Sequence, residues 1–267
     1  MERNVNSGHI VPRKVTNVNI CLKGNMTAMQ TSSRNKPKRS YHHGDLRNAA
    51  VAEAVRAIGQ TRSTDFTLRQ LAARLRVTST ALYRHFPSKL ALLAAVADQG
   101  FRALTQLSRR HDALLDTDPV ACLREHGLEY VRFALRNPAH FRVMFLPELA
   151  RTVADFPALH DSSQALYREL KNALEACQRR GLLNDFSIDA IALTLWATVH
   201  GTSTLLLDGQ VRLGKDGAAS EQESLAVVAQ ILRILREGVL RAAPAKQRAR
   251  PKSAGTKARR PARARAA

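Results

Sequence analysis

Cysteine and aromatic residues are scarce in this sequence of 267 residues, which has 3 Cys and 5% Phe, Trp and Tyr. Cys21, Cys122 and Cys177 form no CxxC pair and show no metal-ligand spacing, and an odd cysteine count in a chain of this length indicates a reducing compartment. No apolar segment follows the polar, charged N-terminus, so no secretory signal is predicted. We therefore expect a cytoplasmic protein that holds neither a metal nor a cofactor.

Catalytic motifs are also missing. No HExxH or ExxH motif occurs, His42 and His43 lie in a segment expected to be a flexible arm, and no nucleophile–base set is visible. We expect no enzymatic activity. The most hydrophobic stretch, residues 188–207, is interrupted by Thr, Ser, His and Gly, which favours a buried helix over a membrane span.

Acidic residues are outnumbered, with 22 Asp and Glu against 42 Lys and Arg and a formal net charge of +20. The excess is uneven, because residues 1–43 carry +7 and residues 241–267 carry +10. The part between them is nearly neutral. Both ends lack hydrophobic periodicity, and we expect disordered basic segments at 1–40 and 242–267. Met26 or Met29 is an alternative translation start to Met1.

Hydrophobic residues make up 45% of the chain, enough for a sizeable core. Alanine and leucine are abundant and β-branched runs are few, so the predicted fold class is all-α. We expect a three-helix head over 41–96, joined by a long helix to a second helical domain over 97–241.

The segment Phe66–Lys89 has the proportions of a helix-turn-helix. Apolar residues spaced i, i+3, i+4 and i+7 from Leu68 predict a first helix, opened by a Thr67–Gln70 capping box. Arg76 and Val77 would form the turn. Thr78 would cap a second helix that ends at Pro87 and turns its apolar residues to the core. The alternative is an ordinary helical hairpin of an all-α protein.

Helices are predicted on both sides of this segment. One spans about 45–58 and is closed by Gly59, and a long one runs from Ser88 to about Leu114. Further helices are expected at about 119–136, 139–145, 159–180, 188–207 and 220–240. Gly181 would stop the third of these.

Two runs in the head resemble TetR-type bacterial transcriptional regulators. They are YHHGDLRNAAVAEAV (residues 41–55) and FTLRQLAARLRVTSTALYRHFPSKLALLAAV (residues 66–96). Weaker likenesses, NPAHFRVMF (137–145) and WATVHG (196–201), resemble the effector domain of one branch of that family, in which a Trp and a His-Gly pair recur. The two basic ends lie outside the resemblance.

The resemblance implies that one set of residues contacts operator DNA. Thr67 would face phosphate at a helix N-terminus. Thr80 and Ala81 could touch a thymine methyl, Arg84 could contact guanine or phosphate, and phosphate is favoured for Tyr83 and Lys89. The full set is Thr67, Thr78, Ser79, Thr80, Ala81, Tyr83, Arg84, His85 and Lys89.

Bulky or polar-tipped residues of the second domain are candidates for the wall of an apolar effector cavity. Each one alone is more often an ordinary core residue. The effector candidates are Tyr130, Phe141, Met144, Phe145, Tyr167, Trp196 and His200, with Phe133 and His140 also considered.

The resemblance further implies a homodimer, formed by the helices at 188–207 and 220–240, that binds a palindromic DNA operator. A small-molecule effector would release the DNA, as expected of a repressor in a bacterial cytoplasm, and no membrane is involved. The alternative is an architectural, nucleoid-associated protein that binds DNA mainly through its basic ends.

Overall fold

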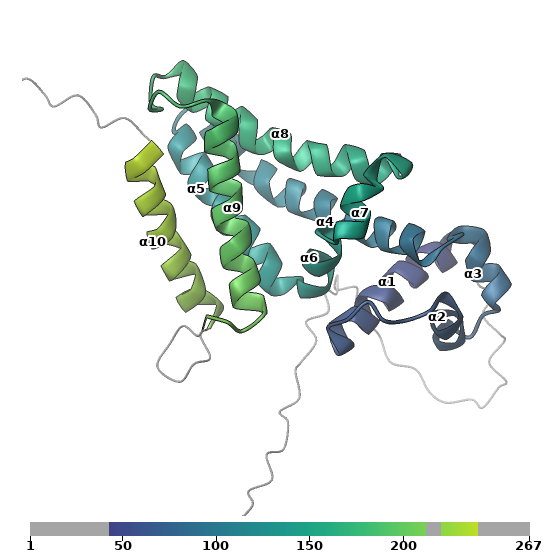
Figure 1. The fold of residues 1–267 in the computed structure, drawn as a ribbon. Helices are drawn as coiled ribbons and strands as arrows, with labels where there is room; N and C mark the ends of the chain where they lie inside the picture. Colours follow the sequence, from purple (N-terminus) through teal and green to yellow (C-terminus); the bar gives the residue numbers. More distant parts are fainter. Residues whose placement is uncertain (1–42, 212–219, 240–267) are drawn as a thin grey trace, which may run out of the picture. The chain divides into compact units, whose positions relative to one another are not determined.

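The computed structural model describes residues 43–211 and 220–239, and within these ranges the chain forms helices and no β-strand (Figure 1). The predicted all-α class is confirmed. Predictions for residues 1–40 and 242–267 fall outside the described residues. The helices are α1 (His43–Thr61), α2 (Leu68–Leu75), α3 (Ser79–His85), α4 (Lys89–Ser108), η1 (Arg109–Leu114), α5 (Pro119–Arg136), α6 (Pro138–Met144), α7 (Pro147–Arg151), η2 (Val153–Asp155), α8 (Pro157–Arg179), α9 (Ile188–Leu207) and α10 (Glu221–Val239).

Local hydrogen bonds fix the start and end of α2. The Thr67 hydroxyl accepts from the Gln70 N–H at 3.2 Å, and the Gln70 side chain accepts from the Thr67 N–H at 2.8 Å. The predicted capping box is therefore confirmed. Arg76 ends the helix in the left-handed region with φ 57°, and the Val77 N–H donates to the Ala72 carbonyl at 3.0 Å. This tight helix end turns the chain directly into α3.

Helix α3 is short and is held by its caps and by two buried side chains. Thr78 accepts from the Ala81 N–H at 3.2 Å, as predicted. Leu82 and Phe86 are buried, with exposed fractions of 0% and 2%. Because both side chains point to the core, the opposite side of α3 is left to solvent.

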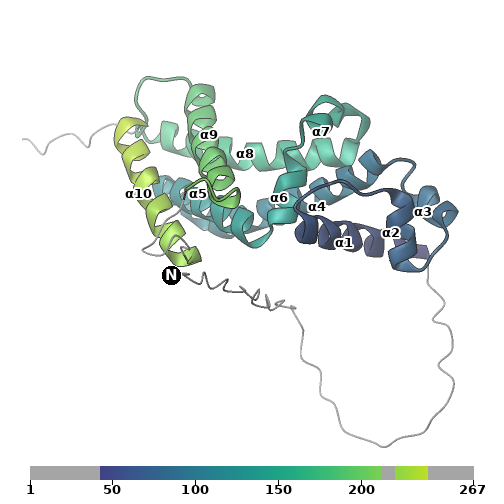
Figure 2. The same cartoon turned by 60° about the horizontal axis from the view of Figure 1, so that its bottom comes forward.

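Helix α4 packs against α1 near its start and against α6 and α8 farther along (Figure 2). Leu92 and Val96 in its first half and Phe101 and Leu104 in its second half are buried in one hydrophobic core. One rigid helix therefore supports both the hairpin and the helices that follow.

The structure corrects two predicted boundaries and adds two short helices. Gly59 lies inside α1, which ends at Thr61, and Arg62 with φ 54° supplies the left-handed turn. The helix predicted to run to Leu114 is α-helical only to Ser108, where the chain tightens into the 3₁₀ helix η1 that packs on α5. The short helices α7 and η2 were not predicted. Gly181, with φ 64°, follows the end of α8 as expected.

Helix α9 is less buried than the sequence predicts. Among the described residues it is the one helix long and apolar enough to cross a membrane by length and composition alone, which is weak evidence, and 22% of that stretch is buried. Leu193, Trp196 and Leu205 are 58%, 37% and 41% exposed. The expectation of a buried helix is wrong for the single chain, because α9 packs on α5, α8 and α10 and still leaves large apolar side chains exposed.

We predict that Leu82→Ala lowers the free energy of unfolding by roughly 2–5 kcal/mol, because it removes a fully buried side chain and leaves a cavity. Thr80→Ala, on the exposed side of the same helix, should change it by no more than about 0.5 kcal/mol. Urea unfolding followed by circular dichroism measures both. Equal losses in the two variants would contradict the assigned orientation of α3.

Candidate functional sites

The first candidate site is the exposed side of α3. Thr80, Tyr83 and Arg84 are exposed at positions i, i+3 and i+4, and Tyr83 keeps 50% of its surface accessible. We call Thr80, Tyr83 and Arg84 the reader face.

The remaining predicted DNA contacts lie around the reader face. Thr78 is exposed, whereas Ser79, Ala81, His85 and Lys89 are half-buried. The Lys89 ammonium lies over the Phe66 ring, 5.3 Å from its centroid, so a cation is fixed at the start of α4.

The capping box already engages both hydrogen-bonding groups with which Thr67 was expected to face phosphate. Its hydroxyl and its backbone N–H are both hydrogen-bonded to Gln70.

Sequence reasoning missed Arg47 of α1, whose guanidinium carbon lies 5.3 Å from the centroid of the Phe86 ring. No periodic pattern in the sequence indicates that α1 and α3 are neighbours. Only the fold therefore shows that the Arg47 cation lies beside the end of α3.

The second candidate site is a cavity of about 660 Å³ bounded by residues of α4 to α10, which we call the aromatic cavity. Six of the seven predicted effector residues line it: Tyr130, Met144, Phe145, Tyr167, Trp196 and His200. Its size is in the range of small-molecule sites, which span roughly 300–1,000 Å³.

Phe141 corrects the predicted set, because it does not line the cavity. It is buried behind the wall, with its ring centroid 5.7 Å from that of Tyr130 and 5.5 Å from that of His200. Phe133 and His140 are likewise outside the lining. Phe141 therefore supports the cavity wall and offers no surface to a ligand.

A hydrogen-bonded triad fixes one wall of the cavity. The Trp196 indole N–H donates to the Tyr130 hydroxyl oxygen at 3.3 Å, and Tyr130 Oη lies 3.0 Å from His200 Nδ1. Burial lowers the pKa of His200 and raises the pKa of Tyr130. The Tyr130 hydroxyl then donates a hydrogen bond to Nδ1 of neutral His200, so each member of the triad has a partner at neutral pH.

Polar groups line another part of the cavity. Glu169 is 7% exposed and forms an ion pair with Arg109 at 2.8 Å. His126 is buried, with its Nε2 3.4 Å from Cys122 Sγ, and burial lowers the pKa of its imidazole. Arg109 thus balances the charge of the Glu169 carboxylate, and the His126 imidazole is neutral. The cavity therefore has a mostly apolar surface with a few polar groups.

Sequence reasoning missed much of the lining. Phe101 was not predicted to line a cavity, and Leu149 and Val153 come from the two short helices that were not predicted. In a sequence, a leucine, valine or phenylalanine that lines a cavity cannot be distinguished from one that fills the core. Only the packing of seven helices around one space distinguishes them.

Two family descriptions match the chain. Residues 50–96 match "Bacterial regulatory proteins, tetR family", and residues 123–228 match "Tetracyclin repressor-like, C-terminal domain". The sequence matches no curated protein significantly.

Solved structures share the fold. A protein of unknown function from Rhodococcus sp. RHA1 is 26% identical with a TM-score of 0.62, covering 76% of this chain and 100% of that one. The ketosteroid transcriptional regulator KstR2 of Mycobacterium tuberculosis is 16% identical with a TM-score of 0.56, covering 74% and 96%. AibR, solved with isovaleryl coenzyme A and operator DNA, is 18% identical with a TM-score of 0.54, covering 69% and 96%. At their levels of identity, the last two show the fold alone.

We predict that Tyr130→Phe lowers the free energy of unfolding by about 1 kcal/mol, because Trp196 and His200 lose their shared partner. It should also shift the emission of Trp196, which is the single tryptophan of the chain. Tyr167→Phe, whose ring lies 6.3 Å from that of Trp196, is the matched control and should change both quantities little. Equal effects in the two variants would contradict the triad.

Proposed function

Because the chain belongs to the TetR family of bacterial transcriptional regulators, we propose that it binds a palindromic operator as a homodimer, represses transcription there, and leaves the DNA when a small effector binds. DNA binding and transcription regulation follow from the family. The repressor role, the dimer, the effector and a place in the bacterial cytoplasm are our proposal.

The observation that supports DNA recognition is that α3 buries one side in the core and exposes polar side chains on the other. Leu82 and Phe86 hold one side in the core, and the reader face presents a hydroxyl, a phenol and a guanidinium on the other. These groups suit the major groove, where hydroxyls contact either base edges or phosphate and Arg contacts guanine or phosphate. We propose 41–96 as the DNA-binding domain, with Lys89 and the α2 N-terminus at Thr67 beside the phosphates.

The uncovered side of α9 supports the dimer. Between Asp189 and Asp208 this helix carries no charged residue, yet Leu193 and Leu205 are exposed. Helix α10 lies beside α9 and exposes Ile234 at 67% (Figures 1 and 2). A second copy that places its own α9 and α10 on this surface would bury these residues in a four-helix bundle.

Helix α4 supports effector control. Phe101 on α4 lines the aromatic cavity, while Leu92 and Val96 on the same helix are in the core shared with α1. A ligand that prefers a different position of Phe101 would move α4 and with it the hairpin. The effector acts only through such a difference in affinity between the two conformers.

We predict that Tyr83→Ala and Lys89→Ala weaken binding to all operator sequences, whereas Thr80→Ala and Arg84→Ala alter preference at defined base pairs by about 1–3 kcal/mol. Fluorescence anisotropy with a panel of single-site operator variants, obtained after genomic fragment selection, measures this. Arg179→Ala removes an exposed arginine of α8 and should leave binding unchanged. Operator affinity and preference unchanged in all four reader variants would refute the assignment.

We predict that Leu193→Glu converts the protein to a monomer in analytical ultracentrifugation and lowers operator affinity at least about tenfold, because charges would be buried unpaired in the bundle. Gln106→Glu on the exposed side of α4 adds the same charge away from this surface and should remain a dimer. A dimer that persists in Leu193→Glu with normal affinity places the interface elsewhere.

A further inference from the structure

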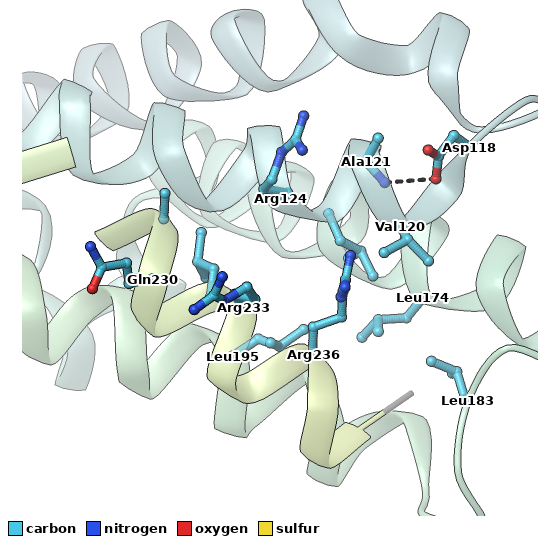
Figure 3. Close-up of a pocket in the computed structure, with 13 residues that line it drawn as sticks. Asp118, Val120, Ala121, Arg124, Leu174, Leu183, Leu195, Gln230, Arg233 and Arg236 are labelled. Carbon is cyan, nitrogen blue, oxygen red and sulfur yellow. Dashed lines mark hydrogen bonds between the residues drawn. The ribbon is translucent and has the colours of Figure 1, made fainter. Parts of the chain in front are cut away.

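A second hollow of about 380 Å³ lies between α5, α8, α9 and α10 (Figure 3). Its apolar lining includes Val120, Leu174 and Leu183. Three arginines are among its lining residues, Arg124 from α5 and Arg233 and Arg236 from α10, and Figure 3 shows the Arg124 side chain directed away from the other two. We call this space the arginine hollow.

The charges around the arginine hollow favour an anion. Among the described residues, no ion pair involves Arg233 or Arg236, whereas Arg124 is hydrogen-bonded to the neighbouring Glu125 at 2.7 Å. Asp118 is the one acidic residue of the lining, and its Oδ1 accepts from the Ala121 N–H at 2.9 Å as the cap of α5. Positive charge therefore outweighs negative charge beside an apolar floor, which suits a carboxylate or phosphate attached to an apolar body.

The arginine hollow and the aromatic cavity share a wall. Leu123 of α5, Leu195 of α9 and Leu232 of α10 line both spaces. At this wall α10 comes very close to α5, since a Cβ added at Gly127 would lie 2.9 Å from Leu232 Cδ1. Leucine side chains can adopt more than one staggered rotamer, so movement of these three shared residues would open a passage between the two spaces.

We propose that the effector is an elongated amphipathic anion. Its apolar body occupies the aromatic cavity, and its chain passes the three leucines. Its carboxylate or phosphate group binds Arg233 and Arg236. This inference rests on the proposed function and specifies the class of ligand for the same site. Such a ligand would tie α10 to α5, so it would act on the proposed dimer helices as well as on α4.

The experiment uses the purified full chain and the emission of Trp196, which lines the aromatic cavity and is the single tryptophan. Three probes with the same apolar chain are titrated below micelle-forming concentrations: dodecanoate, dodecyl phosphate and 1-dodecanol. At least one anion should bind about tenfold tighter than the alcohol, as expected for charge-assisted hydrogen bonds. Comparison of the two anions distinguishes a carboxylate ligand from a phosphate ligand.

The double variant Arg233→Ala/Arg236→Ala should weaken binding of the preferred anion about tenfold and leave binding of 1-dodecanol unchanged. Arg179→Ala is the matched control, and circular dichroism verifies that each variant is folded. Equal affinity for the alcohol and the anions, or an equal loss for all three probes, would overturn the proposal.

Operator binding is measured on the same samples to separate this proposal from the proposed function. If none of the probes binds while the operator does, the ligand class is wrong and the regulator stands. If operator binding itself is missing from the wild-type chain, the proposed function fails, whatever the probes do.

Discussion

The packing of α4 against α1 near its start and against α6 and α8 farther along is the constraint on which the rest of the structure depends. Leu92 and Val96 complete the core beneath the hairpin, and Phe101 and Leu104 continue the same core toward the aromatic cavity. Because close-packed side chains transmit displacements, the hairpin cannot shift without α4, nor α4 without the cavity wall. This helix is the physical basis of the proposed coupling between effector and DNA.

The cavity combines a large apolar surface with a small number of fixed polar points. Tyr130, Trp196 and His200 satisfy one another, and Arg109 compensates Glu169. The space therefore stays open to an apolar body without leaving an unpaired charge in the core. The arginines lie beyond the leucine wall, where they remain near solvent, and this separation gives an amphipathic ligand a defined direction.

The features that could be predicted from the sequence depend on interactions between residues close together in the chain. The caps at Thr67 and Thr78 depend on hydrogen bonds between residues three apart, and each is found where the sequence places it. The hydrophobic spacing that buries Leu82 and Phe86 is equally local. The nine DNA contacts remain predictions, although the structure exposes Thr80, Tyr83 and Arg84 together.

The predictions that were wrong or missing depend on contacts between helices that are far apart in the sequence. The end of α4 at Ser108, the position of Phe141 behind the cavity wall and the uncovered side of α9 all depend on which helices pack together. The arginine hollow is another example, since Arg124 and Arg233 are more than a hundred residues apart. No periodicity within one helix reveals such a meeting, so these features required the three-dimensional fold.

The central claim is that the reader face and the aromatic cavity are coupled through α4, and hydrogen–deuterium exchange of the full chain with and without operator DNA tests it most directly. We predict slower amide exchange on DNA binding in the hairpin and also in residues 97–108 and in α6, which are remote from the reader face. Protection confined to the hairpin and the first turns of α4, with unchanged exchange in residues 97–108 and in α6, would contradict it.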